Sequence, residues 1–124
     1  MNSDIKSKIR EFKTGANRNN DTGKLDYEGF LSPIALQEYA KYMHRHRLLE
    51  DGTMRDSDNW QLGIPKQEYV KSLLRHTMDL WLENRGYQSR EGKIDALCGI
   101  LFNAFGYLHE ELKGGNINER KDAN

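Results

Sequence analysis

Three side chains of the types that bind metal ions recur along one side of a predicted helix. His76, Asp79 and Glu83 are three and four residues apart, and on an α-helix this spacing places them, with Ser72, in one narrow sector. Oxygen ligands with one imidazole suit a hard divalent cation such as Mg²⁺ or Mn²⁺. The pattern predicts a metal site, and the alternative is a solvated helix edge with a half-buried histidine.

A second polar face belongs to the predicted helix 94–112. Gly99 and Gly106 are seven residues apart on it, and each glycine destabilises a helix by about 1 kcal/mol relative to alanine. Another group is therefore expected to approach this face closely. Either a neighbouring helix packs there, or a nucleotide ring lies there with Asn103 hydrogen-bonded to it. Asp95, on the same face, would add a carboxylate to the metal site.

Two loop-rich segments carry groups that suit a phosphate or a base. Arg18 and Lys24 flank the turn-rich run around Gly23, which forms either an anion-binding arm or an ordinary solvated turn. Asn59, Trp60 and Lys66 lie around a predicted long loop. Trp60 can stack on a base, although a tryptophan in such a loop more often inserts into the core.

Three helices must position these groups. Capping and terminating signals predict helices over residues 33–46, 66–84 and 94–112, with a loop over 50–65 and a left-handed terminus at Gly86. Residues 1–31 are expected to form a loop-rich arm and residues 113–124 a flexible tail. The fold class is thus a small all-α helical bundle within a single domain, residues 1–124.

Apolar residues predict which helix faces are buried. The helix over 66–84 is expected inside the bundle, because its apolar side chains cover more than half of its circumference. On the helix over 94–112 one apolar face is formed by Leu97, Leu101, Ala104, Phe105, Leu108 and Leu112. Glu38 lies opposite the apolar stripe of the first helix and faces either solvent or a site.

Composition restricts the partners. Of 124 residues, 36% are hydrophobic and 31% charged, so one copy has a modest core and a dimer or tetramer is expected. Lysine plus arginine equals aspartate plus glutamate at 19 each, which argues against binding polymeric nucleic acid. A single cysteine, Cys98, in an apolar context fits a reducing compartment, and no apolar run suits a membrane span or a signal core. The cytoplasm is the expected location, that of the host if the chain is phage-encoded.

Several short motifs occur together in a recognisable order. They are Gly15-Ala16-Asn17-Arg18, Gly23-Lys24, Leu31-Ser32-Pro33, Asn59-Trp60, Gly63-Ile64-Pro65, Arg75-His76 and Phe102-Asn103-Ala104. In this order, over about residues 14 to 112, the chain resembles the phage and bacterial dATP/dGTP diphosphohydrolases, relatives of the MazG-like all-α nucleoside triphosphate pyrophosphatases. One difference is Lys41, which follows Glu38 where MazG-like enzymes carry a second glutamate.

The resemblance implies metal-dependent hydrolysis of a purine deoxynucleoside triphosphate to the monophosphate and pyrophosphate. Arg75, His76 and Asn103 match family motif positions, and Glu83 falls where the family often has an acidic residue. The resulting hypothesis assigns the metal to Glu38, His76, Asp79, Glu83 and Asp95, and the catalytic roles to Glu38, Asp79 and Glu83. It assigns the phosphates to Arg18, Lys24, Lys66 and Arg75 and the base to Trp60 and Asn103, with Asn59 as a further nucleotide-binding residue. The alternatives are a protein that sequesters a nucleotide or cyclic nucleotide without cleaving it, and a structural helical oligomer.

Overall fold

The computed structural model describes residues 9–11, 13–19 and 22–114. The chain divides into two compact units, Met1–Ser32 and Pro33–Asn124. The boundary falls next to Pro33, where the predicted arm ends and the first long helix begins.

The N-terminal unit is more ordered than the predicted loop-rich arm. Strand β1 (Ile9–Glu11) pairs antiparallel with β2 (Asn17–Asn19), and the single turn α2 (Tyr27–Phe30) follows. The Asp26 carboxylate caps α2 by accepting a hydrogen bond from the Gly29 amide at 3.0 Å.

The second unit confirms the three predicted helices. They are α3 (Pro33–Arg45), α4 (Lys66–Asn84) and α5 (Lys93–Gly114), and with α2 they make the described chain mostly helical. Helix α4 ends at Gly86, whose φ is 87°, because the Tyr87 amide donates to the Leu82 carbonyl and the Gly86 amide to the Glu83 carbonyl. The predicted tail beyond Gly114 lies outside the described residues.

The loop predicted over residues 50–65 is pinned at both ends. Leu48 bridges Met54, and a short 3₁₀ turn, η1 (Asn59–Leu62), precedes α4. The Trp60 ring packs edge-on against His109 of α5, with ring centroids 4.8 Å apart. The contact of Trp60 with His109 therefore holds this loop against α5.

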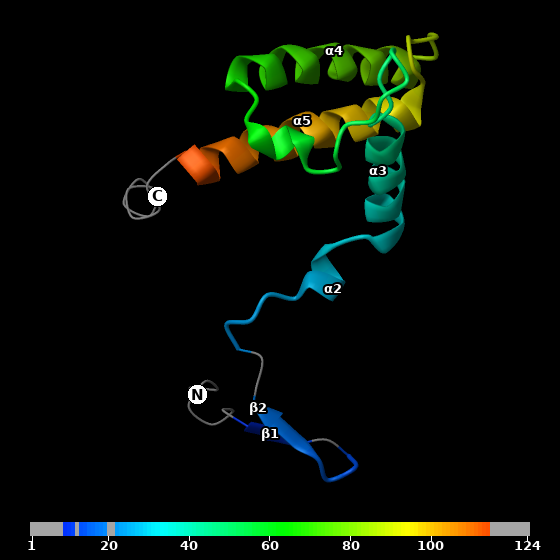
Figure 1. Cartoon of the computed structure of the whole chain (residues 1–124). Coiled ribbons are helices and arrows are strands. Elements are labelled where there is room, and N and C mark those ends of the chain that lie inside the picture. The colour runs from blue at the N-terminus through cyan, green and yellow to red at the C-terminus, as the bar shows by residue number, and fades with distance from the viewer. Residues whose placement is uncertain (1–8, 12, 20–21, 115–124) are drawn as a thin grey trace. The chain divides into compact units, whose positions relative to one another are not determined.

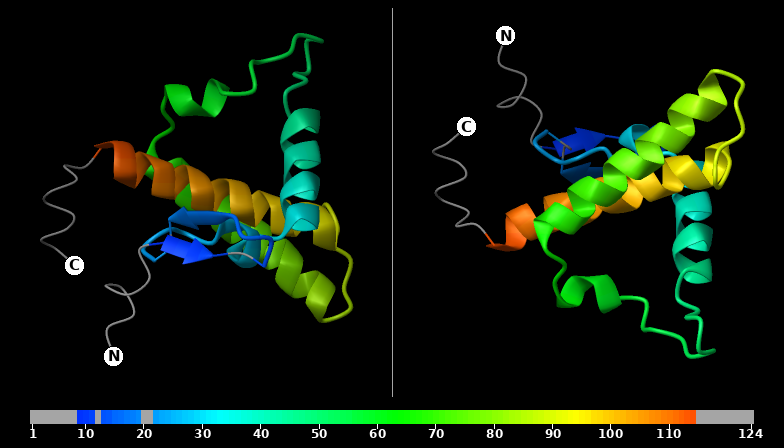
Figure 2. Two further views of the ribbon diagram at one scale, coloured as in Figure 1. Left: turned by 90° about the horizontal axis from the view of Figure 1, so that it is seen from below. Right: turned by 90° about the horizontal axis from the view of Figure 1, so that it is seen from above.

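Helices α4 and α5 form an antiparallel hairpin, and α3 crosses α5 (Figures 1 and 2). Tyr39 of α3 contacts Phe105 of α5 edge-on, and Arg45 of α3 pairs with Asp95 of α5 at 2.9 Å. In the connection between α4 and α5, residues 85–92, Glu91 lines a cavity together with Tyr42 of α3 and His46, which follows α3.

The prediction that the helix over 66–84 lies inside the bundle is wrong within one copy, and α5 buries its glycine face rather than its apolar face there. Helix α4 buries Tyr69 and Asp79, whereas its apolar residues Leu74, Met78, Trp81 and Leu82 are exposed. Helix α5 buries Ala96, Cys98, Gly99, Asn103 and Gly106, whereas Leu97, Ala104, Phe105, Leu108 and Leu112 are exposed and Leu101 is half-buried. The two helices meet through their small and polar faces because glycine permits a closer approach than leucine. Cys98 is buried as predicted.

Of the helices in the described ranges, none combines the length and apolar character that a membrane crossing requires.

Candidate functional site

Gly99 and Gly106 of α5 are explained by side chains of α4. A Cβ at Gly99 would lie 2.5 Å from Nδ1 of His76, and a Cβ at Gly106 would overlap the Tyr69 ring. Asn103, between them, donates from Nδ2 to Ser72 Oγ at 3.1 Å and to the Gly99 carbonyl at 2.7 Å. Of the two alternatives for this face, the structure supports tight helix packing, and Asn103 is part of that packing.

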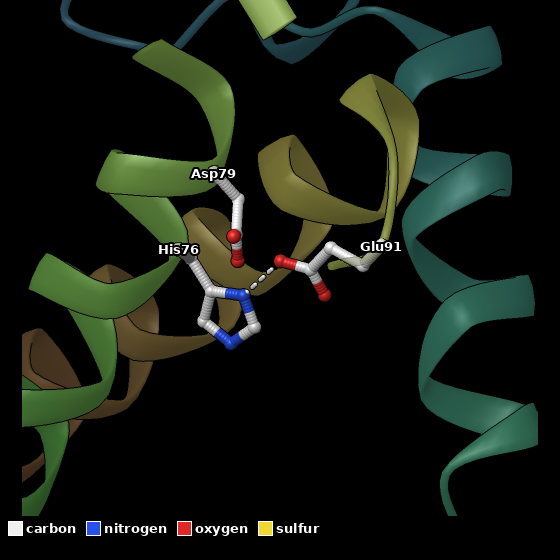
Figure 3. A group of neighbouring side chains, drawn as sticks. All are labelled: His76, Asp79 and Glu91. Atoms are coloured by element: carbon white, nitrogen blue, oxygen red, sulfur yellow. Dashed lines mark hydrogen bonds and ion pairs between the residues drawn. The ribbon is translucent and has the colours of Figure 1, made fainter. Parts of the chain in front are cut away.

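His76 and Asp79 come together with Glu91, which precedes α5. One potential ligand atom from each of the three residues lies within 4.8 Å of the other two. Both carboxylates point toward the imidazole, Asp79 from α4 and Glu91 from the connecting segment (Figure 3). The imidazole Nδ1 and Glu91 Oε1 are 2.5 Å apart and share a hydrogen bond. Two carboxylates and one imidazole are a donor set that Mg²⁺ or Mn²⁺ accepts.

Arg90 holds the Asp79 carboxylate. Its Nε donates to Oδ1 at 3.1 Å and to Oδ2 at 3.0 Å, and its Nη2 donates to Oδ2 at 2.5 Å. The Arg90 guanidinium lowers the pKa of the Asp79 carboxyl, and burial opposes this effect. Asp79 is 3% exposed, so little water reaches its carboxylate. The Arg90 guanidinium compensates the charge that water does not.

The other predicted acidic ligands lie outside this cluster. Glu83 accepts hydrogen bonds at 3.0 Å from the amide and from the hydroxyl of Ser89, and it thereby fixes the segment that carries Glu91. Asp95 pairs with Arg45. Glu38 is half-buried on α3 and is not among the residues whose ligand atoms meet in the described part of the chain.

A cavity of about 360 Å³ opens beside the cluster. His76, Glu91, Asn59 and Trp60 are among its lining residues, with the carboxylate of Asp56. Arg47 also lines the cavity, with Arg55, Ser72 and Phe102 among the other lining residues. The volume falls in the range of small-molecule sites, and the lining joins apolar rings to cationic and metal-ligand groups.

The two arginines of the cavity are held by backbone carbonyls. Arg47 Nε donates to the Arg55 carbonyl at 2.9 Å, and Arg55 donates from Nε at 3.1 Å and from Nη2 at 2.9 Å to the His46 carbonyl. A guanidinium has five N–H donors, so these bonds orient the side chains and leave each of them capable of binding an anion.

Neither predicted phosphate-binding cation of the helical unit lines the cavity. Lys66 pairs with Glu111 at 2.7 Å, and Arg75 is exposed on α4 and does not line the cavity. Arg18 belongs to β2 and Lys24 to the segment before α2, both within the N-terminal unit.

Sequence reasoning missed Glu91, Arg90, Arg47 and Arg55. All four lie in connecting segments, where helical periodicity gives no information about side-chain direction. A weak signal was available for Glu91, because Ser89-Arg90-Glu91 is a polar run between Gly86 and Gly92, immediately before a helix.

Comparison of the chain with protein-family models, with curated proteins and with solved structures finds no match.

Proposed function

We propose that the chain hydrolyses a purine nucleoside or deoxynucleoside triphosphate to the monophosphate and pyrophosphate, as a homo-oligomer that uses Mg²⁺ or Mn²⁺. The observation that carries the proposal is the convergence of His76, Asp79 and Glu91 within 4.8 Å at the edge of a cavity that also has arginines and Trp60 in its lining. The resemblance to dATP/dGTP diphosphohydrolases suggests the substrate.

Each group has a role in this reaction. The imidazole and the two carboxylates would hold the cation, which when bound supplies an activated water and neutralises phosphate charge. Arg47 and Arg55 would bind phosphate oxygens through guanidinium N–H groups. Trp60 would contact the base by stacking. The oxygen of a water bonds to the α-phosphorus as the water gives up a proton to solvent, the bond between that phosphorus and the α,β-bridging oxygen breaks, and pyrophosphate leaves with the bridging oxygen.

Two bonds seen in the cluster must change for a cation to bind. The proton between His76 Nδ1 and Glu91 Oε1 must leave Nδ1 if that nitrogen becomes a ligand. At least one Asp79 oxygen must also exchange the Arg90 guanidinium for the cation. Arg90 would then act as a cationic substitute that keeps the metal-free site neutralised.

The test is incubation of the purified chain with dATP or dGTP and Mg²⁺ or Mn²⁺, followed by ³¹P NMR. We expect equal amounts of monophosphate and pyrophosphate, no product with chelator, and loss of turnover in Asp79→Asn. Asp95→Asn is the matched control, because Asp95 pairs with Arg45 outside the cluster. Failure of every nucleoside triphosphate to yield pyrophosphate with either metal refutes the hydrolase proposal.

A second function is favoured by the Arg90–Asp79 pair itself. Because Arg90 occupies both oxygens of Asp79, the cavity can bind a nucleotide without a cation on that carboxylate. The chain would then sequester a nucleotide or cyclic nucleotide intact. Recovery of unaltered ligand, with an affinity that chelator leaves unchanged, identifies this function in the same experiment.

A further inference from the structure

The apolar side chains of the described residues are poorly covered within one copy. The buried hydrophobic residues are Tyr42, Tyr69, Ala96 and Cys98, and none of the leucine, isoleucine, valine, phenylalanine, methionine or tryptophan side chains in the described ranges is among them. Burial of such side chains is the main favourable contribution to folding. The exposed faces of the helical unit are therefore expected to be covered by another surface.

Helix α5 carries the longest of these faces. We name as the α5 stripe six side chains at intervals of three and four residues: Ile94, Leu97, Leu101, Phe105, Leu108 and Leu112. Leu101 is half-buried, and the others are between 42% and 55% exposed. The stripe runs for roughly 27 Å along the helix, and its spacing is that of the contact seam between two paired helices.

The charges beside the stripe indicate what covers it. Lys93 and Glu111 are eighteen residues apart, which is five helical turns, so both lie on the same flank of the stripe at its opposite ends. In an antiparallel pair of two α5 helices, each Lys93 lies near the partner's Glu111, which also pairs with Lys66 of its own chain. In a parallel pair the two Lys93 side chains would instead lie at the same end on opposite flanks, away from both Glu111 side chains. The formal net charge of zero also removes net repulsion between copies.

We propose that the α5 stripe is the seam of a homodimer, in which α5 of a second copy lies antiparallel along it. The arrangement is isologous, with the two-fold axis crossing α5 near Asn103. Leu97 then meets Leu108 of the partner subunit. Gly99 and His76 lie on the opposite side of α5, so the seam leaves the metal cluster within one copy, and the dimer does not depend on the hydrolase proposal.

The outer face of α4 is a weaker seam. Leu74, Met78 and Trp81 are exposed there, but Thr77 interrupts the run and the Arg85 guanidinium lies over the Trp81 ring, 5.8 Å from its centroid. This face is shorter than the α5 stripe, and its Trp81 has a charged partner, whereas Phe105 of the stripe contacts an aromatic ring, that of Tyr39. It therefore provides the matched control for substitutions in the α5 stripe.

Sedimentation velocity of the full chain tests whether the protein is a dimer and whether the α5 stripe is the dimer contact. The wild type is expected at twice the chain mass of 14.5 kDa, and Leu101→Lys is expected to raise the dimer dissociation constant by roughly 100-fold or more. Leu74→Lys, on α4, is expected to leave it within about threefold. A monomeric wild type, including one whose own N-terminal unit covers the stripe, overturns the proposal. So does a dimer that Leu74→Lys dissociates and Leu101→Lys does not.

Cysteine crosslinking tests whether the two α5 helices run antiparallel, and it keeps a lysine out of the seam. In a Cys98→Ala background, Leu97→Cys combined with Leu108→Cys is expected to form disulfides between copies. Leu97→Cys alone is expected to remain unlinked, because in the antiparallel pair the two Leu97 positions are roughly 16 Å apart along the axis. Efficient crosslinking of Leu97→Cys alone would show a parallel pair and overturn the proposed arrangement.

Discussion

Replacement of Gly99 by alanine should displace His76 from Asp79 and Glu91, the other two residues of the proposed metal site. The added Cβ would lie 2.5 Å from Nδ1 and 2.6 Å from Cε1 and Cγ of the imidazole. Ordinary contact begins at 3.4 Å, so the ring must move by roughly 1 Å in an interior that packs closely. Such a movement breaks the 2.5 Å contact between His76 and Glu91.

The two energetic consequences of Gly99→Ala differ in sign. Alanine stabilises a helix by about 1 kcal/mol relative to glycine, whereas overpacking costs about 1–3 kcal/mol. The free energy of unfolding should therefore fall by about 0–2 kcal/mol. The affinity for Mn²⁺ should fall by roughly tenfold or more, because a displaced ligand no longer meets the other two.

Isothermal titration with Mn²⁺ and urea unfolding measure these effects separately. Gly106→Ala is the matched control, because its Cβ meets Tyr69 at the other end of the same helix contact and should lower stability without changing Mn²⁺ affinity. Gly114→Ala, at the last residue of α5 with nothing within 4 Å of the added Cβ, should leave Mn²⁺ affinity unchanged and should not lower stability. Equal Mn²⁺ affinity in Gly99→Ala and the wild type would refute the reasoning.

Three further predictions follow from charged and phenolic groups. Arg90→Ala should tighten Mn²⁺ binding by roughly tenfold, because the guanidinium no longer competes with Mn²⁺ for Asp79. Arg85→Ala should leave Mn²⁺ binding unchanged, and weaker binding in Arg90→Ala would contradict the competition between Arg90 and the metal. Because Arg90 lowers the pKa of the Asp79 carboxyl in the fold, the stabilisation from this pair is present above the carboxyl's unfolded pKa near 4 and is lost as the pH falls. Acid unfolding of Asp79→Asn should therefore depend less on pH than that of the wild type, and an unchanged dependence would contradict the pair's contribution. Burial raises the pKa of Tyr39 and of Tyr42 to about 12, so stability should fall between about pH 10 and pH 12, and ultraviolet titration should show tyrosines ionising near pH 12 in the folded chain; complete ionisation near pH 10 without unfolding would contradict it.

Capping and terminating residues predicted the bounds of the helices well, because they act on the backbone within one helical turn. Pro33 begins α3, and Gly86 ends α4 through hydrogen bonds that only a left-handed residue permits there. Periodicity also placed His76 and Asp79 on one side of α4, and both belong to the cluster.

Face assignment failed because apolar periodicity shows that a surface is to be buried and not which molecule buries it. On α5, the leucine face remains exposed and the face with Gly99 and Gly106 is packed. The glycines carried the needed information, since only a close neighbour explains two of them on one face. Glu91 could not be found by helix geometry, because its direction is set by residues 85–92 and by the bonds from Ser89 to Glu83.

The most direct test of the proposed metal site measures Mn²⁺ binding by the Glu91→Gln and Glu83→Gln variants. Electron paramagnetic resonance of the free ion reports how much Mn²⁺ is bound. Glutamine at either position keeps the size and one acceptor oxygen but removes the charge, and at position 83 that oxygen can still accept from Ser89. Wild type should bind Mn²⁺, Glu91→Gln should bind it at least roughly tenfold more weakly, and Glu83→Gln should remain within about twofold. Absence of Mn²⁺ binding by the wild type, or loss in Glu83→Gln with retention in Glu91→Gln, would contradict the assignment of His76, Asp79 and Glu91.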